Sequence, residues 1–118
     1  MEKMEVVAGL SALAQDTRLD IFRLLVQAGK DGRAVGHIGE KLGLPSATLS
    51  FHLNQLKHAG LVTFRREGRS LIYSVNFAAM NGLMTFLTEN CCGGSDCEIA
   101  PVACDPPGRI RIMKRADA

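Results

Sequence analysis

The spacing of apolar residues changes at Leu61, and this change constrains the fold more than any other feature of the sequence. Before Leu61, apolar residues recur every three or four positions, which predicts four helices. These helices are expected over residues 5–15, 17–28, 35–42 and 46–59. After it, segments 61–66 and 70–75 flank a turn and predict a β-hairpin, and residues 77–89 return to helical spacing. We therefore expect a mainly α fold with one β-hairpin, an α+β class.

Three expectations concern the faces and ends of these helices. The apolar face of the first helix would consist of Val6, Leu10 and Leu13. Thr17 and Asp20 have the spacing of a capping box at the start of the second helix. Ser46 follows a tight connection and is expected to cap the helix that begins there.

The order of the predicted elements is typical of one DNA-binding architecture. Two short helices, 35–42 and 46–59, are joined by a three-residue turn and followed by the hairpin, as in a winged helix-turn-helix. In such domains the second helix enters the major groove of DNA, and the hairpin, or wing, approaches the phosphates or the minor groove. Residues 46–59 are therefore expected to contact the bases.

The residues that would contact DNA follow from the apolar face of that helix. Leu49, Leu53 and Leu56 share one face, so the opposite face is presented outward. Hydroxyl and amide side chains can bond to base edges, an apolar group can contact a thymine methyl, and wing arginines suit phosphates. A merely solvated face is the ordinary alternative, but the aromatic Phe51 on that face needs a partner. The predicted DNA contacts are Ser46, Ala47, Thr48, Ser50, Phe51, His52, Asn54, Gln55, Lys57, Arg65, Arg66 and Arg69.

Net charge and cysteine content limit the class of protein. A formal net charge of +2 excludes a strongly cationic nucleic-acid coat protein but allows a local basic face. The sequence shows no secretory signal and no apolar run of membrane-spanning length, so we expect a soluble, cytoplasmic protein with no membrane partner. Thiols stay reduced in the cytosol, which favours ligand or redox roles for the four cysteines over disulfides.

Three separated motifs resemble the ArsR/SmtB family of metalloregulatory repressors. Residues 13–25 (LAQDTRLDIFRLL) are similar to the family's second helix, and residues 44–62 (LPSATLSFHLNQLKHAGLV) to its recognition helix and the start of its wing. Residues 66–73 (REGRSLIY) are similar to the wing itself, and the resemblance runs from about residue 6 to 90. It implies a homodimeric repressor, dimerised through its first and last helices, that leaves its operator when an inducer binds.

Two inducer sites that occur in this family are absent from the sequence. Many arsenic-responsive members carry a Cys-Val-Cys type box in the first helix of the helix-turn-helix, but residues 33–39 contain no cysteine. Zinc- and cobalt-sensing members place Asp, His and Glu ligands on the last helix, but residues 77–88 contain none of these. Any inducer site must lie elsewhere. His37, His52 and His58 all lie in the predicted DNA-binding unit, where packing or DNA contact is the ordinary role.

Three cysteines cluster directly after the last predicted helix. Cys91 and Cys92 are adjacent, and a Gly-Gly turn lies between them and Cys97. The three thiolates can therefore gather on one soft ion. Trivalent arsenic suits three sulfurs, antimony(III) is similar, and a methylated arsenic(III) would need only two. The segment resembles the adjacent-cysteine site that some family members carry at the end of the last helix. Cys104 could be a fourth ligand or a bystander. Tetrahedral zinc and a thiol redox switch are the alternatives.

These observations predict two parts and one function. A winged helix-turn-helix DNA-binding and dimerisation domain would span residues 1–90, and a cysteine-containing inducer-binding tail residues 91–118. The chain is expected to be a homodimeric repressor that releases operator DNA when As(III) binds the tail. A constitutive winged-helix regulator and a redox-sensing repressor are the alternatives. An enzyme is disfavoured, because the sequence has no phosphate-binding loop at a cysteine and no Cys–His constellation near the tail.

Overall fold

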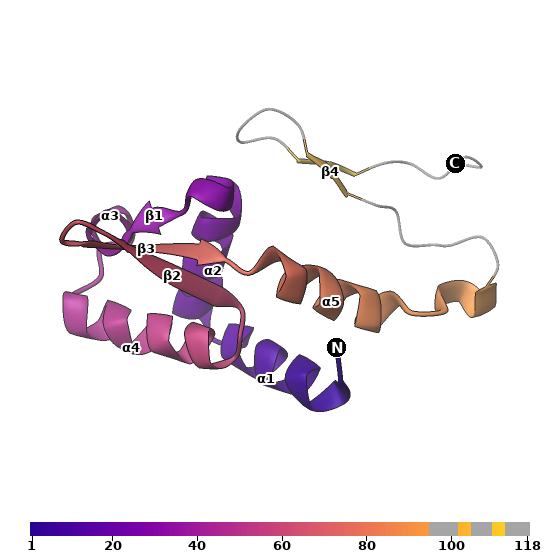
Figure 1. The fold of residues 1–118 in the computed structure, drawn as a ribbon. Helices are drawn as coiled ribbons and strands as arrows, with labels where there is room; N and C mark the ends of the chain where they lie inside the picture. The colour runs from indigo at the N-terminus through magenta and orange to yellow at the C-terminus, as the bar shows by residue number, and fades with distance from the viewer. Residues whose placement is uncertain (95–101, 105–109, 113–118) are drawn as a thin grey trace. The chain divides into compact units, whose positions relative to one another are not determined.

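The computed structural model of the chain describes residues 1–94, 102–104 and 110–112. The chain divides into two compact units, Met1–Phe86 and Leu87–Ala118. The elements in chain order (Figure 1) are α1 (Lys3–Leu13), α2 (Asp16–Ala28), the 3₁₀ turn η1 (Gly29–Asp31), β1 (Arg33–Ala34), α3 (Val35–Leu42), α4 (Ser46–His58), β2 (Val62–Glu67), β3 (Ser70–Val75), α5 (Phe77–Thr88), η2 (Cys91–Gly94), β4 (Val102–Cys104) and β5 (Ile110–Ile112). This order confirms the predicted winged helix-turn-helix fold.

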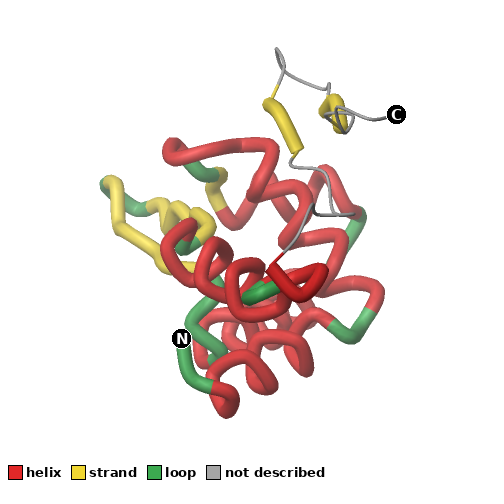
Figure 2. The backbone as a smooth tube through the Cα atoms, turned by 90° about the vertical axis from the view of Figure 1, so that its right-hand side faces the viewer, coloured by secondary structure: helices red, strands yellow, loops and turns green. Residues whose placement is uncertain are grey.

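The wing is part of a three-stranded antiparallel sheet in the order β1-β3-β2. Helices make up most of the first unit, and its strands gather at one side (Figure 2). The sequence predicted β2 and β3 but missed β1, which has only two residues and so no detectable alternation. β1 follows Gly32, whose φ is +69° and whose missing side chain lets it approach the backbone of β3. A Cβ at Gly32 would collide with the carbonyl oxygen of Tyr73, so only glycine fits there.

The core of the first unit lies beneath the helix-turn-helix. Leu49, Leu53 and Leu56 of α4 are buried, as their spacing predicted. They belong to one apolar cluster with buried residues of α2, α3, β2 and β3, which are Ile21, Phe22, Leu25, Ile38, Val62, Tyr73 and Val75. α4 therefore has one face committed to the core and the other facing outward.

Two helix starts differ from the sequence prediction. α2 begins at Asp16, and Gln15 is its N-cap, with Oε1 accepting a bond of 2.8 Å from the backbone N–H of Arg18. The capping box predicted at Thr17 and Asp20 is therefore wrong, because both residues already lie inside the helix. Ser46 is likewise the first residue of α4 rather than its cap; Pro45 holds the N-cap position and provides no side-chain bond.

The buried face of α1 agrees fully with the predicted one only at Val6. Val6, Gly9 and Ala12 are buried, whereas Leu10 is exposed and Leu13 is half-buried. Small residues are buried because α1 packs closely: an ideal Cβ at Gly9 would lie 3.1 Å from Cδ1 of Leu83 in α5. Met4, Val7 and Leu10 of α1 are consequently exposed, whereas Leu13 still packs against the edge of the core. None of the described helices combines the length and apolar character needed to cross a bilayer.

Candidate DNA-binding interface

The outer face of α4 presents most of the side chains that the sequence assigned to DNA. Phe51 is 56% exposed, which is high for an aromatic residue in a helix, and Lys57 is half-buried. The remaining outward residues, all exposed, are Ser46, Ala47, Thr48, Ser50, Asn54 and Gln55. Their exposure leaves hydroxyl and amide groups available to base edges. Contact of these residues with DNA stays a prediction.

His52 departs from this pattern. Only 9% of it is exposed, and Nη1 of Arg18 in α2 lies 3.2 Å from its Nδ1. Burial lowers the pKa of His52, and the Arg18 charge lowers it further, while Asp16 acts in the opposite direction. The assignment of His52 to direct DNA contact is therefore revised: its ring lies toward α2, on the inner side of α4.

Arg18 was not among the residues predicted from the sequence. Its Nε donates to the backbone carbonyl of Ala12 in the last turn of α1, over 2.7 Å, and its Nη1 reaches His52. His52 lies 34 positions further along the chain, so no local spacing could have indicated the pair.

A groove of about 540 Å³ separates α4 from the wing. Residues of α4, β2, β3, the hairpin turn, β1 and the start of α3 line it. Its polar and cationic lining residues include Ser50, Asn54, Lys57, Arg66, Arg69 and Ser70. Three cations beside several hydrogen-bonding side chains suit a phosphodiester strand that passes between the helix and the wing.

The wing arginines do not all face this groove. Strand residues alternate between faces, and Arg66 lines the groove together with Phe64 two positions earlier. Nζ of Lys57 lies 5.0 Å from the centroid of the Phe64 ring, a cation–π contact that joins α4 to β2. The sequence missed this role of Phe64, which is half exposed and stacks against Tyr73.

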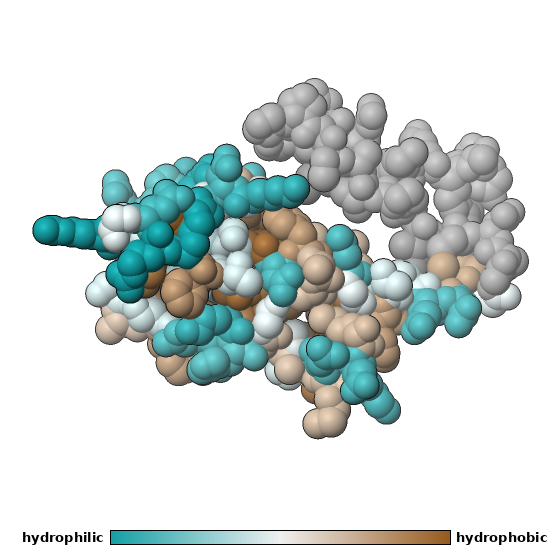
Figure 3. All heavy atoms as spheres, in the orientation of Figure 1, coloured by the Kyte–Doolittle hydropathy of each residue, from teal (hydrophilic) through white to brown (hydrophobic). Residues whose placement is uncertain are grey.

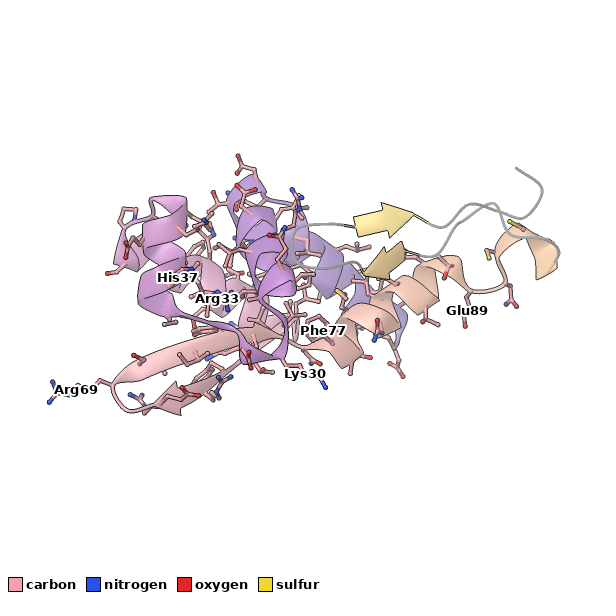
Figure 4. The ribbon with its side chains drawn as sticks, turned by 90° about the horizontal axis from the view of Figure 1, so that it is seen from above. Lys30, Arg33, His37, Arg69, Phe77 and Glu89 are labelled. Carbon is pink, nitrogen blue, oxygen red and sulfur yellow. The ribbon has the colours of Figure 1, made fainter. Side chains whose placement is uncertain are left out.

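Arg65 lies on the other side of the strand and is bonded within the protomer. Its Nε donates to Oε2 of Glu67 over 2.7 Å, and its Nη2 donates to the carbonyl of Asp31 in η1 over 3.0 Å. Arg69 instead extends from the tip of the hairpin (Figure 4). Hydrophilic side chains gather around this end of the hairpin (Figure 3). The three arginines that the sequence grouped together therefore have different surroundings.

The first two cysteines of the chain lie shortly after the end of α5. Cys91 is half-buried and Cys92 is exposed, and both belong to η2. Cys92 has a φ of 58° and Gly93 a φ of 62°, so the chain turns sharply at the adjacent cysteines. Cys97 lies outside the described residues, and of Cys104 only the backbone, in β4, is described. Within the described part of the chain, no three His, Cys, Asp or Glu side chains are grouped as a metal site.

Large apolar side chains are exposed along one side of α1. Met4 is 83% exposed and Val7 55%, and Leu10 one turn further is also exposed. We call these three residues the α1 apolar face. An apolar helix face of this kind in a small domain is typical of a surface that a partner covers.

Comparison with known proteins identifies the fold and the class. A family model described as a helix-turn-helix domain matches residues 13–64, which include α2 to α4 but end before the cysteines. Nodulation protein NolR of Rhizobium meliloti is 37% identical over 89 residues, which cover 75% of this chain and 70% of NolR.

Two solved structures extend the comparison. One is a homodimeric winged helix-turn-helix DNA-binding domain of Mycobacterium bovis, described as a possible ArsR-family regulator. It is 34% identical, with a TM-score of 0.58, over 73% of this chain and 80% of that chain. The other, described as a possible transcriptional regulator for arsenical resistance, is 28% identical, with a TM-score of 0.59, over 67% of this chain and 79% of that chain.

Proposed function

The chain belongs to the ArsR/SmtB family of winged helix-turn-helix transcriptional regulators, and on this premise we propose that it is a homodimeric repressor released from its operator by trivalent arsenic. Similar proteins are named as helix-turn-helix transcriptional regulators, so the chain is a DNA-binding transcriptional regulator and not an enzyme, as the sequence predicted. Repression, dimerisation and the arsenic response are the proposed steps.

The groove between α4 and the wing is the observation that most supports this mode of DNA binding. Lys57, Arg66 and Arg69 place positive charge along it, and Asn54 stands at its edge on the outer face of α4. A phosphate strand in the groove would direct the exposed face of α4 into the adjacent major groove. Phosphate contacts would then fix the orientation of the domain, and the side chains of α4 would select the bases.

Dimerisation follows from the α1 apolar face. A second copy that covers Met4, Val7 and Leu10 would remove these apolar side chains from water. The homodimeric Mycobacterium bovis structure supports a homodimer by similarity. Two copies related by a twofold axis would present their α4 helices to successive major grooves, so the operator is expected to be an inverted repeat.

The thiols after α5 are the candidate inducer site. Cys91 and Cys92 are the described members, and Cys97 is the third thiol in the sequence. The donor chemistry fits trivalent arsenic or antimony, which bind thiolates and take three of them; two adjacent thiols would serve a methylated arsenic(III). The similar solved structure that is described as a possible transcriptional regulator for arsenical resistance supports this choice of ion. Cys91 and Cys92 follow shortly after α5, a helix expected to form part of the dimer interface. An ion that draws their thiolates together can therefore alter the spacing of the two α4 helices.

Operator release requires a modest coupling between the two sites. A hundredfold loss of DNA affinity corresponds to about 2.7 kcal/mol, within the usual range for allosteric proteins. The coupling is reciprocal, so operator DNA should weaken arsenite binding by the same factor.

The direct experiment measures operator affinity with and without arsenite. An operator selected from random-sequence DNA is labelled, and fluorescence anisotropy gives its Kd for the wild-type chain and for Cys91→Ser, Cys92→Ser, Cys97→Ser and Cys104→Ser. Arsenite should weaken wild-type binding by about a hundredfold and leave Cys92→Ser bound. The response of Cys104→Ser shows whether the fourth cysteine is a ligand.

The other outcomes overturn the proposal in recognisable ways. Release by hydrogen peroxide but not by arsenite would make the chain a redox-sensing repressor. Unchanged affinity in both reagents would make it a constitutive regulator. Failure of the wild-type chain to select any DNA sequence would contradict the proposed function as a whole.

A further inference from the structure

We propose that Arg18 and His52 are positioning residues that hold the recognition helix α4 in its DNA-binding orientation and connect it to the end of α1. Arg18 donates from Nε to the carbonyl of Ala12 over 2.7 Å and from Nη1 to Nδ1 of His52 over 3.2 Å. We call this pair of hydrogen bonds the Arg18 link. Its role in DNA binding rests on the proposed function, but its chemistry can be tested without DNA.

Arg18 is well placed to join two elements. Ala12 lies in the last turn of α1, where carbonyls have no partner within the helix and where a cation is favoured by the helix dipole. The backbone of Arg18 is itself held, because its N–H donates to Oε1 of Gln15 over 2.8 Å. The guanidinium therefore spans from a fixed start of α2 to both α1 and α4.

The link dictates the protonation of His52. A guanidinium has only N–H donors, so Nδ1 of His52 must be the acceptor and the ring proton must lie on Nε2. A protonated ring would lose the acceptor and set two cations against each other. Arg18 and Asp16, both in the first turn of α2, are the charged groups that act on the ring, and α1 contributes the Ala12 carbonyl to the link.

The sign of the pH dependence follows from this arrangement. Burial and Arg18 outweigh Asp16, so the pKa of His52 in the folded chain lies below its ordinary value. The folded chain thus favours the neutral ring. The link is intact above the ordinary histidine pKa of about 6.5 and is lost as pH falls through the lowered folded-state value.

The link also reaches the DNA-facing side of α4. The ring of His52 meets that of its neighbour Phe51 edge to face, with centroids 5.4 Å apart and an interplanar angle of 65°. Phe51 is the exposed aromatic residue on the outer face. Leucine contacts beneath α4 are non-directional, whereas hydrogen bonds require one geometry, so the link selects one orientation of the helix. An unbroken series of contacts then runs from the last turn of α1 through Arg18 and His52 to Phe51.

Three variants separate this role from simple packing. His52→Asn keeps an acceptor near the Nδ1 position but cannot be protonated. His52→Leu fills the space without an acceptor, and Arg18→Met keeps an apolar stem without donors. Arg23→Met, at an exposed arginine of the same helix α2, is the control. The unfolding temperature of each variant is measured by circular dichroism, and operator affinity by anisotropy from pH 5 to pH 8.

The expected results form a pattern that loss of packing would not give. At pH 7.5, His52→Leu and Arg18→Met should bind operator about tenfold more weakly than wild type, the scale of a lost hydrogen bond to a charged group. His52→Asn and Arg23→Met should bind within a small factor of wild type. Wild-type affinity should fall in acid, while that of His52→Asn should not. Positive charge gained in acid would by itself strengthen binding to a polyanion, so a fall in affinity points to loss of the link.

NMR of the ¹⁵N-labelled imidazole tests the link directly, even if His52→Leu does not fold. The wild-type chain should show an unprotonated Nδ1 and a protonated Nε2 at neutral pH; a proton on Nδ1 would overturn the inference. Equal DNA affinity of folded wild type, His52→Leu and Arg18→Met would also overturn it and leave the proposed function intact. Absence of DNA binding by wild type would contradict the proposed function, and the tautomer would still decide whether the link exists.

Discussion

Arg65 and Arg66 are adjacent in sequence but differ in their surroundings. Arg65 is bonded to Glu67 and to the Asp31 carbonyl, whereas Arg66 lines the groove beside α4. The Arg65–Glu67 ion pair is exposed on both sides, so it adds little to stability. The difference between the two residues therefore concerns which one is available to a phosphate.

Arg66→Ala is expected to weaken operator binding by about tenfold and to reduce the slope of log Kd against log salt concentration by about one. Arg65→Ala removes the same charge from the other face and serves as the matched comparison, with a clearly smaller effect on both quantities. Anisotropy titrations at several salt concentrations give both values. Equal losses for the two variants would show that the groove is not where the phosphate lies.

At the scale of the element, α4 has one buried side and one exposed side. Leu49, Leu53 and Leu56 attach it to the core, and the opposite side is exposed over most of its length. Phe51 lies on that exposed side, where an aromatic ring adds little to the stability of the protomer. Its apolar edge suits the 5-methyl group of thymine.

Phe51→Ala should therefore change the free energy of unfolding by less than about 1 kcal/mol while weakening operator binding. The measurement compares operators that contain thymine with operators in which deoxyuridine replaces it. At one position of the operator, replacing thymine by deoxyuridine should weaken binding of the wild-type chain. The same replacement should leave binding of Phe51→Ala unchanged. A preference for thymine that survives in Phe51→Ala would assign the methyl contact to another side chain.

At the scale of the whole molecule, the described part of the protomer leaves an apolar surface exposed on α1. Gly9 brings α1 close to α5, and the larger side chains Met4, Val7 and Leu10 are left on the outside. A second copy of the chain would bury them and pair the two α4 helices. Dimerisation and high affinity for an inverted repeat are therefore expected to depend on the same surface.

Val7→Glu should convert the dimer to a monomer, because a carboxylate would be buried without a partner. Leu19→Glu, which places the same charge at an exposed apolar residue of α2, should remain dimeric. Light scattering after size-exclusion chromatography gives the mass, and affinity for the full operator should fall in Val7→Glu alone. A dimeric Val7→Glu variant would place the interface elsewhere.

Local spacing in the sequence was enough to predict the main elements of the fold. The Leu49, Leu53 and Leu56 stripe located α4 and its buried face, because both depend on helical periodicity within one segment. Gly43 adopts a φ of 66° and ends α3 where the sequence predicted, since glycine tolerates that conformation. The hairpin was similarly evident from a turn between two strand-like segments.

Features that depend on distant residues were decided by the tertiary structure alone. His52 points inward because Arg18, 34 positions earlier, meets its ring, and Arg65 is occupied because Asp31, also 34 positions earlier, lies beside the wing. Leu10 is exposed because Leu83 comes so close to Gly9 that α1 buries its small residues instead. Periodicity reports only that a helix has an apolar side; which neighbour meets it depends on how the elements pack. The sequence by itself therefore determined the winged helix-turn-helix and the buried stripe of α4, and packing determined which side chains on these elements remain exposed.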